Sequence, residues 1–450
     1  MLNLPTKCYF LNILGHFYPL FFNTTYRMAA FAAVSFAEGI TFSAWLRNIA
    51  APVANNGEDT VTVAGNSWGT PARSARLNVT AVAPDGNAGF NMGIYNDSTM
   101  GKLNSGDEAN LWVKPLDIVK VSYGKYDNNT LRGDVCYGSW NWQRPNSAWL
   151  EGDEGLLMSG TARGENTGLM AEITPMDGLY IQALVPITDK VVKAGDTYKK
   201  LRGGFAYTVP GLVKVKGQYI GRGAGKIDYA VDDKKATKDE YDAAVAANEA
   251  LTVVAYDEAG NPLYATKNAA KKVQKEVEGN SNCDLEAEID VLAVEGLFAG
   301  VGFRYDVRKD GKTNNKGEEN MKVALGVSYQ VMPELKVSAS GAYFTYYGEK
   351  VDPRFQAGAG VDYDLGDGLA MNADFRYVSK SGNDGKKDKN SDHMAFAVGV
   401  TKNVSSNGYI GVAFQGMTNS GNFAGMDGKL KDRKDAKFVW TVPVALSVWF

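Results

Sequence analysis

The chain has 450 residues, of which 44% are hydrophobic and 22% are charged, and its formal net charge is only -3. This length allows one large domain or two, and the small net charge gives no reason to expect a nucleic-acid partner. Fifty glycines and 23 tyrosines favour a β-rich protein, while three cysteines are too few for a disulfide scaffold.

The first 37 residues have the character of an export leader. The stretch MAAFAAVSFAEG contains Ser35-Phe36-Ala37, a small-x-small pattern at which signal peptidases cleave. We therefore expect a signal segment over residues 1–37 and a single domain over residues 38–450. A buried N-terminal segment is the alternative.

From residue 39 onward, short segments alternate apolar with polar or small residues. In FQAGAGVDYDLGDGLAMNADFRYVSK, Phe355 and Val361 share one face, Gln356 and Asp362 share the other, and Gly366–Gly368 form a tight turn. Eight such hairpins follow a first strand at 39–47, and a closing strand follows them at 439–450. Their turns lie at 84–89, 115–117, 176–178, 209–211, 294–296, 332–334, 366–368 and 403–408.

The connections between hairpins are mostly longer than the turns within them. The long connections are 51–73, 128–167, 224–282, 381–392 and 419–436. This asymmetry is typical of a transmembrane barrel with short periplasmic turns and long extracellular loops. We therefore predict an all-β fold: a closed antiparallel transmembrane β-barrel of about 18 strands, within a range of about 16–18. A β-sandwich also alternates, but it has no reason to place its long loops at one end.

Aromatic residues on the apolar face fall into two groups. Those near the short turns are Tyr207, Tyr329, Tyr363 and Phe450, and those near the long connections are Tyr123, Tyr219, Tyr305, Tyr347, Phe355, Tyr377 and Trp440. Two aromatic belts around an aliphatic band are expected where side chains meet both membrane interfaces. The apolar face is thus predicted to contact lipid.

The last strand carries a resemblance to a known class of protein. Val442, Val444, Leu446, Val448 and Phe450 resemble the C-terminal assembly signal of bacterial outer-membrane β-barrels. The whole chain resembles outer-membrane porins in strand number, loop asymmetry and length. GITFSAWLR, WVKPLDIVKVSYGKYDNNTLRGD and SVWF are most similar to porin-like proteins of spirochaetes. The resemblance implies outer-membrane lipid and the barrel-assembly machinery as partners, and it allows a homotrimer.

The face opposite the apolar one is polar and often charged. The residues predicted to line the lumen and set selectivity are Lys214, Lys216, Arg222, Glu286, Glu288, Asp290, Arg304, Asp306, Asp362, Asp374 and Arg376. Because ionised groups are costly to desolvate, this face is expected to be wet. The charges are interpreted either as salt bridges that hold the wall or as a transverse field that orients solutes.

The connection 128–167 is the third on the long side. In the porins that the chain resembles, the third loop folds inward and narrows the channel. By that resemblance, Arg132, Asp134, Arg144, Glu151 and Asp153 are the candidate constriction residues, with Trp140, Trp142 and Trp149 as wall anchors. An exposed surface loop is the alternative.

The insert 224–282 is expected to be an extracellular cap that is partly helical. Thr237 and Glu240 have capping-box spacing, and a second helical stretch is predicted over 266–279. A partly disordered loop is the alternative.

The sequence predicts a porin-like channel for passive diffusion of small hydrophilic solutes. We expect no enzyme activity, no cofactor and no metal site, because no HExxH, GxSxG or P-loop motif occurs. A surface adhesin or structural barrel is one alternative, and Arg132-Gly133-Asp134 spells an adhesion tripeptide. A transporter of hydrophobic compounds is another. A Cys136–Cys283 bridge is a further hypothesis.

Overall fold

The computed structural model describes the chain in blocks. They are 39–66, 75–96, 103–134, 136, 155–160, 162, 166–188, 191–231, 251–256, 262–266, 271–307, 319–347, 352–379, 392–418 and 438–450. Within these residues, 19 strands form one sheet and two further strands form a separate hairpin.

The large sheet uses nearly every apolar–polar alternating segment of the sequence. Its strands are β1 (Ile40–Asn55), β2 (Thr60–Asn66), β3 (Ala75–Val82), β4 (Ala88–Asn96), β5 (Leu103–Leu116), β6 (Val119–Tyr126), β7 (Asn166–Met176), β8 (Leu179–Pro186), β9 (Arg202–Val209), β10 (Val213–Val231), β13 (Lys271–Val291), β14 (Leu297–Val307), β15 (Glu319–Met332), β16 (Leu335–Tyr346), β17 (Arg354–Gly366), β18 (Leu369–Val378), β19 (His393–Ser405), β20 (Gly408–Thr418) and β21 (Phe438–Trp449). β11 (Leu251–Tyr256) and β12 (Pro262–Thr266) form the separate hairpin, and the only helix among the described residues is the short α3 (Ala194–Tyr198).

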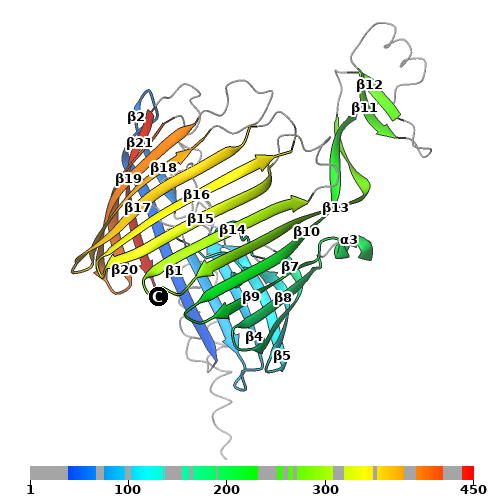
Figure 1. Ribbon diagram of the computed structural model, residues 1–450, viewed down its shortest axis with the longest axis horizontal. Helices are drawn as coiled ribbons and strands as arrows, with labels where there is room; N and C mark the ends of the chain where they lie inside the picture. The colour runs from blue at the N-terminus through cyan, green and yellow to red at the C-terminus, as the bar shows by residue number, and fades with distance from the viewer. Residues whose placement is uncertain are drawn as a thin grey trace, which may run out of the picture.

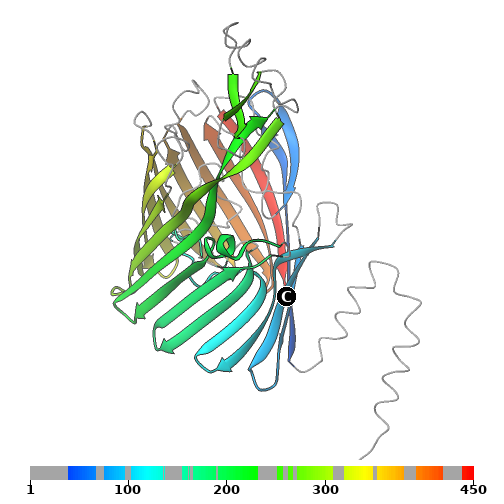
Figure 2. The ribbon, with the colours of Figure 1, turned by 90° about the vertical axis from the view of Figure 1, so that its right-hand side faces the viewer.

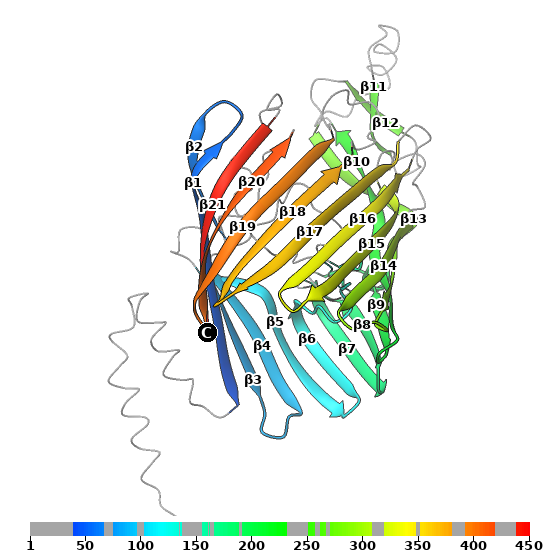
Figure 3. The same cartoon turned by 60° about the vertical axis from the view of Figure 1, so that its left-hand side comes forward.

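The sheet closes on itself into a barrel. Successive strands pair antiparallel around the ring, and β1 pairs with β21 from Trp45↔Trp449 to Asn55↔Trp440 (Figures 1 and 3). β3 pairs with the first half of β1 and β2 with the second half, so these two strands share one position. The 19 strands therefore fill 18 places, which confirms the predicted closed antiparallel barrel of about 18 strands.

The seam between β1 and β21 contains an irregularity that follows from two prolines. The β1–β21 register shifts between Ala50 and Val53, opposite Val444 and Val442. Pro52 and Pro443 lie in this interval, and neither can donate a backbone hydrogen bond to the ladder. A bulge at the seam absorbs both residues without opening the barrel.

Strand alternation sorts side chains to the two faces of the wall. Leu325 is 55% exposed and Leu446 is 58% exposed on the outer face, whereas Glu288 is 1% exposed on the inner face. The aromatic residues Tyr123, Tyr207, Tyr329 and Phe355 are also exposed on the outside. Because successive residues of a strand point to opposite faces, this arrangement follows directly from the period-2 pattern.

Part of the connection at 51–73 was predicted as loop, and this was wrong. β1 runs on to Asn55 and turns through residues 56–59 into β2. The strand continues because Ala50–Asn55 pair with β21 on one side and with β2 on the other, and this pairing outweighs weak local propensity.

The second helix predicted over 266–279 is also wrong where the structure describes it. β10 and β13 extend together beyond the barrel, pairing Lys226–Val231 with Lys271–Glu276. Figure 1 shows this ribbon and the β11–β12 hairpin projecting from the rim. Cross-strand pairing overrides the helix propensity of the Lys- and Glu-rich segment. The first predicted helix, near 237–250, lies outside the described residues.

The helix α3 is an element that the sequence analysis missed. It belongs to the connection between β8 and β9, and Figure 2 shows it at the side of the barrel. No helix among the described residues is long and apolar enough to cross a membrane.

Candidate functional site

The inner faces of β10, β13 and β14 form one charged wall. Their registers place Lys216 beside Glu288, Gln218 beside Glu286, and Glu286 beside Arg304. Charges of opposite sign thus meet across neighbouring strands, which is the arrangement that stabilises cross-strand pairs.

These cross-strand neighbours form ion pairs. Lys216 Nζ lies 3.2 Å from Glu288 Oε1, and Arg304 Nη2 lies 2.7 Å from Glu286 Oε1. Arg222 Nε donates a 2.8 Å hydrogen bond to Asp284 Oδ2. The salt-bridge interpretation of this wall therefore has direct geometric support, and the transverse field stays a prediction.

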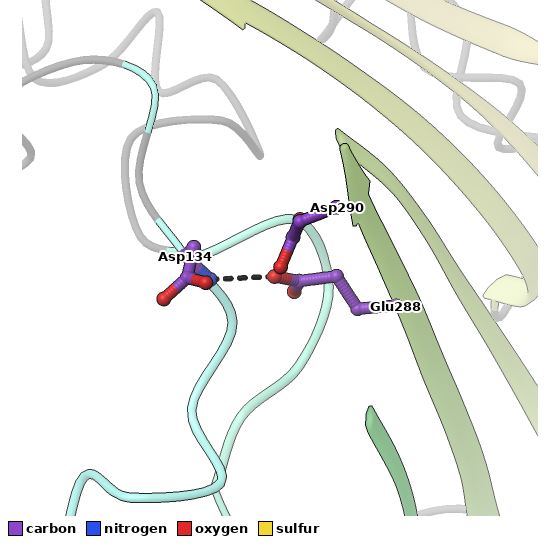
Figure 4. A group of neighbouring side chains, drawn as sticks. All are labelled: Asp134, Glu288 and Asp290. Atoms are coloured by element: carbon purple, nitrogen blue, oxygen red, sulfur yellow. Dashed lines mark hydrogen bonds between the residues drawn. The ribbon is translucent and has the colours of Figure 1, made fainter. Parts of the chain in front are cut away.

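Two segments of the connection 128–167 lie against this wall from inside. The Asp134 N–H donates to Glu288 Oε1 over 2.7 Å, and Lys216 Nζ donates to the Arg132 carbonyl over 2.8 Å. The Ser159 N–H donates to Glu286 Oε2 over 2.8 Å. We call residues 128–134 and 155–160 the inner loop segments. Figure 4 shows Asp134 beside the wall carboxylates Glu288 and Asp290.

The inner loop segments also bury apolar side chains against the wall. Leu131 and Leu156 are fully buried, and Leu156 and Leu157 pack with Ala324 and Phe344. These contacts exclude water from this part of the inner face. The expectation that all wall charges are solvated is therefore wrong for Lys216 and Glu288, each 1% exposed, because the loop covers them.

A glycine on the wall allows the loop to come this close. A Cβ on Gly302 would stand 1.6 Å from the carbonyl oxygen of Leu156, a distance that no side chain tolerates. Leu156 and Leu157 have φ angles of 45° and 75°, in the left-handed region that costs non-glycine residues free energy. The buried contacts of both leucines hold this backbone in place.

Asp134 is the charged centre of the loop–wall contact. Its carboxylate lies 2.7 Å from Lys214 Nζ and 3.2 Å from Lys216 Nζ. Burial alone would raise the pKa of this carboxyl, but the Lys216 charge and the Lys214 hydrogen bond outweigh burial and lower the pKa below its ordinary value. Asp134 is thus ionised at neutral pH and ties the loop to β10.

The remaining predicted site residues are not part of this contact. Asp374 and Arg376 pair with each other on β18, with 2.6 Å between Arg376 Nε and Asp374 Oδ1, and both are buried. Asp362 is opposite Lys336 and Asn372 in the ladder. Asp306 lies 3.9 Å from Arg222. Arg144, Glu151, Asp153 and the three tryptophans lie outside the described residues.

The loop also contacts β7 through Glu172, a contact that was not predicted from the sequence. Glu172 on β7 pairs with Lys120 at 2.9 Å, accepts a 2.7 Å hydrogen bond from the Tyr180 hydroxyl, and accepts one from Asn128. The alternation of LMAEITPM already placed Glu172 on the polar face. Ser159 carried no such signal, because it lies in a connection without periodicity.

The Cys136–Cys283 bridge, raised as a hypothesis from the sequence, is absent, and both cysteines are free. Cys136 is buried beside Phe298, with its Sγ 3.8 Å from the Ala339 carbonyl oxygen, whereas Cys283 lies on β13 opposite Gly221. The inward fold of the loop takes Cys136 to a different part of the wall.

Comparison with known proteins finds only solved structures that are similar at low sequence identity and low TM-score. No protein-family model matches the chain, and no curated protein matches it. Among solved structures, in-vitro folded OmpT, an outer membrane protein of Vibrio cholerae, aligns over 92% of this chain and 100% of its own, with 11% identity and a TM-score of 0.43.

Two further structures align in the same way. The anion-selective porin from Comamonas acidovorans covers 91% of this chain and 99% of its own at 12% identity and TM-score 0.42. A mutant of the Rh. blastica porin covers 91% and 100% at 11% identity and TM-score 0.41. Because every one of these TM-scores is below 0.5, the architecture rests on the strand pairing of this chain itself. None of these three structures supports the predicted spirochaete origin.

Proposed function

We propose that the chain is an outer-membrane channel for passive diffusion of small hydrophilic solutes. The observation that carries this proposal is a closed barrel of 18 strand places with charged residues inside and apolar residues outside. Barrels of about 16–18 strands are wide enough for an aqueous channel, and an apolar outer surface requires lipid. Small solutes and lipid are therefore the partners, and neither covalent chemistry nor a cofactor takes part.

The inner loop segments support a role in narrowing the lumen. They are bound to β10 and β13 by hydrogen bonds and pack on β15 and β16 through buried leucines, so they occupy space on the inner side of the barrel. A loop fixed in this way reduces the open cross-section for solutes.

The adhesin alternative receives less support from the same geometry. The backbone of Arg132 and Asp134 is bonded to the inner wall, so the Arg132-Gly133-Asp134 tripeptide is not presented to a receptor. The hydrophobic-transporter alternative requires an apolar inner pocket. The wall instead presents Lys214, Arg222 and Arg304 among its carboxylates.

Planar bilayers test the channel directly. Protein refolded in detergent and shown to be folded by its heat-modifiable mobility on gels is expected to produce discrete conductance steps. Deleting residues 138–150 is expected to raise the single-channel conductance, because the deletion shortens the loop that the inner loop segments anchor to the wall. A folded barrel that stays electrically silent contradicts the channel, and steps of unchanged size after the deletion contradict the constriction.

A further inference from the structure

Three carboxylates converge where the loop meets the wall. Ligand oxygens of Asp134, Glu288 and Asp290 all lie within 4.8 Å of one another. Figure 4 shows the Asp290 and Glu288 carboxylates turned toward each other, with Asp134 approaching from the loop. Three negative groups in so small a volume repel one another, and the repulsion is strong where water is excluded.

The neighbouring lysines neutralise only one side of this cluster. Lys214 Nζ lies 2.7 Å from Asp134 Oδ2, and Lys216 Nζ lies 3.2 Å from both Asp134 Oδ1 and Glu288 Oε1. Among the described residues, neither oxygen of Asp290 has a hydrogen-bond partner, and Glu288 Oε2 has none either. Asp290 is 0% exposed, so water does not satisfy these oxygens from outside. An unpartnered buried carboxylate is strongly destabilising, because no donor replaces the water that it has lost.

A backbone carbonyl oxygen lies close to the unpartnered oxygen of Glu288. A Cβ on Gly133 would stand 1.6 Å from the Gly155 carbonyl oxygen and 2.2 Å from Glu288 Oε2, so these two acceptors are close neighbours. The Gly155 oxygen accepts one hydrogen bond, from the Met158 N–H over 3.0 Å, whereas Glu288 Oε2 has no donor among the described residues, so a positive ion beside the two oxygens would relieve their repulsion. Carboxylates combined with a carbonyl oxygen are the ligand set that Ca²⁺ prefers, and Ca²⁺ tolerates irregular geometry.

We propose that Glu288, Asp290 and Asp134 bind one Ca²⁺ ion that fastens the inner loop to the barrel wall. The excess negative charge of three carboxylates over two lysines supplies the attraction. Asp134 lies more than 150 positions from Glu288 and Asp290 in the chain, which is why no ligand motif is visible in the sequence. The site does not depend on the proposed channel function, because ion binding is measured without conductance.

Calorimetry on the refolded full chain, stripped with EDTA and titrated with CaCl₂ at neutral pH, tests the site. We expect saturable binding of one ion to the wild type and at least tenfold weaker binding to Asp290→Asn, which keeps the side-chain volume. Asp306→Asn is the matched control: it removes the same charge from the same wall outside the cluster, and its affinity is expected to stay within twofold of wild type.

Thermal unfolding gives a second readout. A second variant, Glu288→Gln, keeps the test valid if Asp290→Asn folds poorly. Ca²⁺ is expected to raise the unfolding temperature of the wild type and of Asp306→Asn, and to leave that of Asp290→Asn or Glu288→Gln unchanged. Folded wild type that shows neither binding nor stabilisation overturns the proposal, as does Asp290→Asn binding with wild-type affinity. A wild type that ignores Ca²⁺ but changes stability around neutral pH indicates a proton shared between Glu288 and Asp290 instead, and this also overturns it.

Discussion

At the scale of single residues, Lys216 has a double role in the contact between loop and wall. Its ammonium group binds the Glu288 carboxylate, the Asp134 carboxylate and the Arg132 carbonyl, and the residue is 1% exposed. Lys214 reaches Asp134 from the same strand and is more exposed. The two lysines are thus the positive charges of β10 that lie nearest to the carboxylates of Asp134, Glu288 and Asp290.

Replacing both lysines by methionine is expected to shift ion preference toward cations. The double variant removes two positive charges and leaves Asp134, Glu288 and Asp290 without compensation. The reversal potential in a salt gradient across planar bilayers measures the shift. Arginine at both positions keeps the charge and serves as the control, and an identical reversal potential in the methionine variant would reject the prediction.

Gly302 is the residue that sets how closely the loop approaches. Gly302→Ala places a Cβ against the Leu156 carbonyl and is expected to destabilise the loop–wall contact by about 1–3 kcal/mol. Single-channel conductance should rise as the inner loop segments move away. Gly341→Ala is the control, because its Cβ would meet only the Gln356 carbonyl at an ordinary 3.4 Å. Equal conductance and equal stability in the two variants would show that the close approach has no role.

At the scale of elements, each strand carries two different surfaces. On β15, Leu325 and Val327 are exposed on the outside, while Ala324 is fully buried inside. The same alternation runs through β21, where Leu446 and Val448 face out and Ala445 and Ser447 face in. The predicted assembly signal therefore lies on the outer face, and its recognition by assembly machinery stays a prediction.

A charge on the outer face tests whether that face contacts lipid. Leu325→Arg lies mid-strand and is expected to destabilise the barrel in lipid by about 2–4 kcal/mol. Val331→Arg lies beside the β15–β16 turn and is expected to cost about 0–1 kcal/mol, because arginine there reaches water. Urea unfolding in lipid vesicles, followed by tryptophan fluorescence, measures both. A similar cost at the two positions would argue against a membrane centred on the middle of the strand.

At the scale of the whole molecule, closure through β1 and β21 decides whether the backbone N–H and C=O groups at the two ends of the sheet are hydrogen-bonded. The seam pairs the two ends of the sheet, and Ala44 and Phe450 exchange both backbone hydrogen bonds. A barrel has no free edge, so its backbone is satisfied without water. The same closure separates an inner from an outer environment.

Cysteine labelling tests this separation. In a background where Cys8, Cys136 and Cys283 are serine, Asp362→Cys is expected to react with a charged, water-soluble thiol reagent. Val361→Cys, the adjacent residue on the outer face, should react at least tenfold more slowly when the protein is in lipid. Reaction of both at the same rate would contradict a membrane-embedded barrel.

The sequence by itself determined the barrel. The alternation of apolar and polar residues, with short turns between strands, fixes which face of each strand is apolar, and it does so without knowledge of the neighbouring strands. The eight hairpins, the strand number and the inward direction of Lys216, Glu288 and Arg376 follow from that local rule. Only the tertiary structure decided that the inner loop segments bond to β10 and β13, that the 271–279 segment forms a strand, and that Asp134 joins Glu288 and Asp290. These contacts join segments far apart in the chain, and their energies depend on neighbours that no local pattern records.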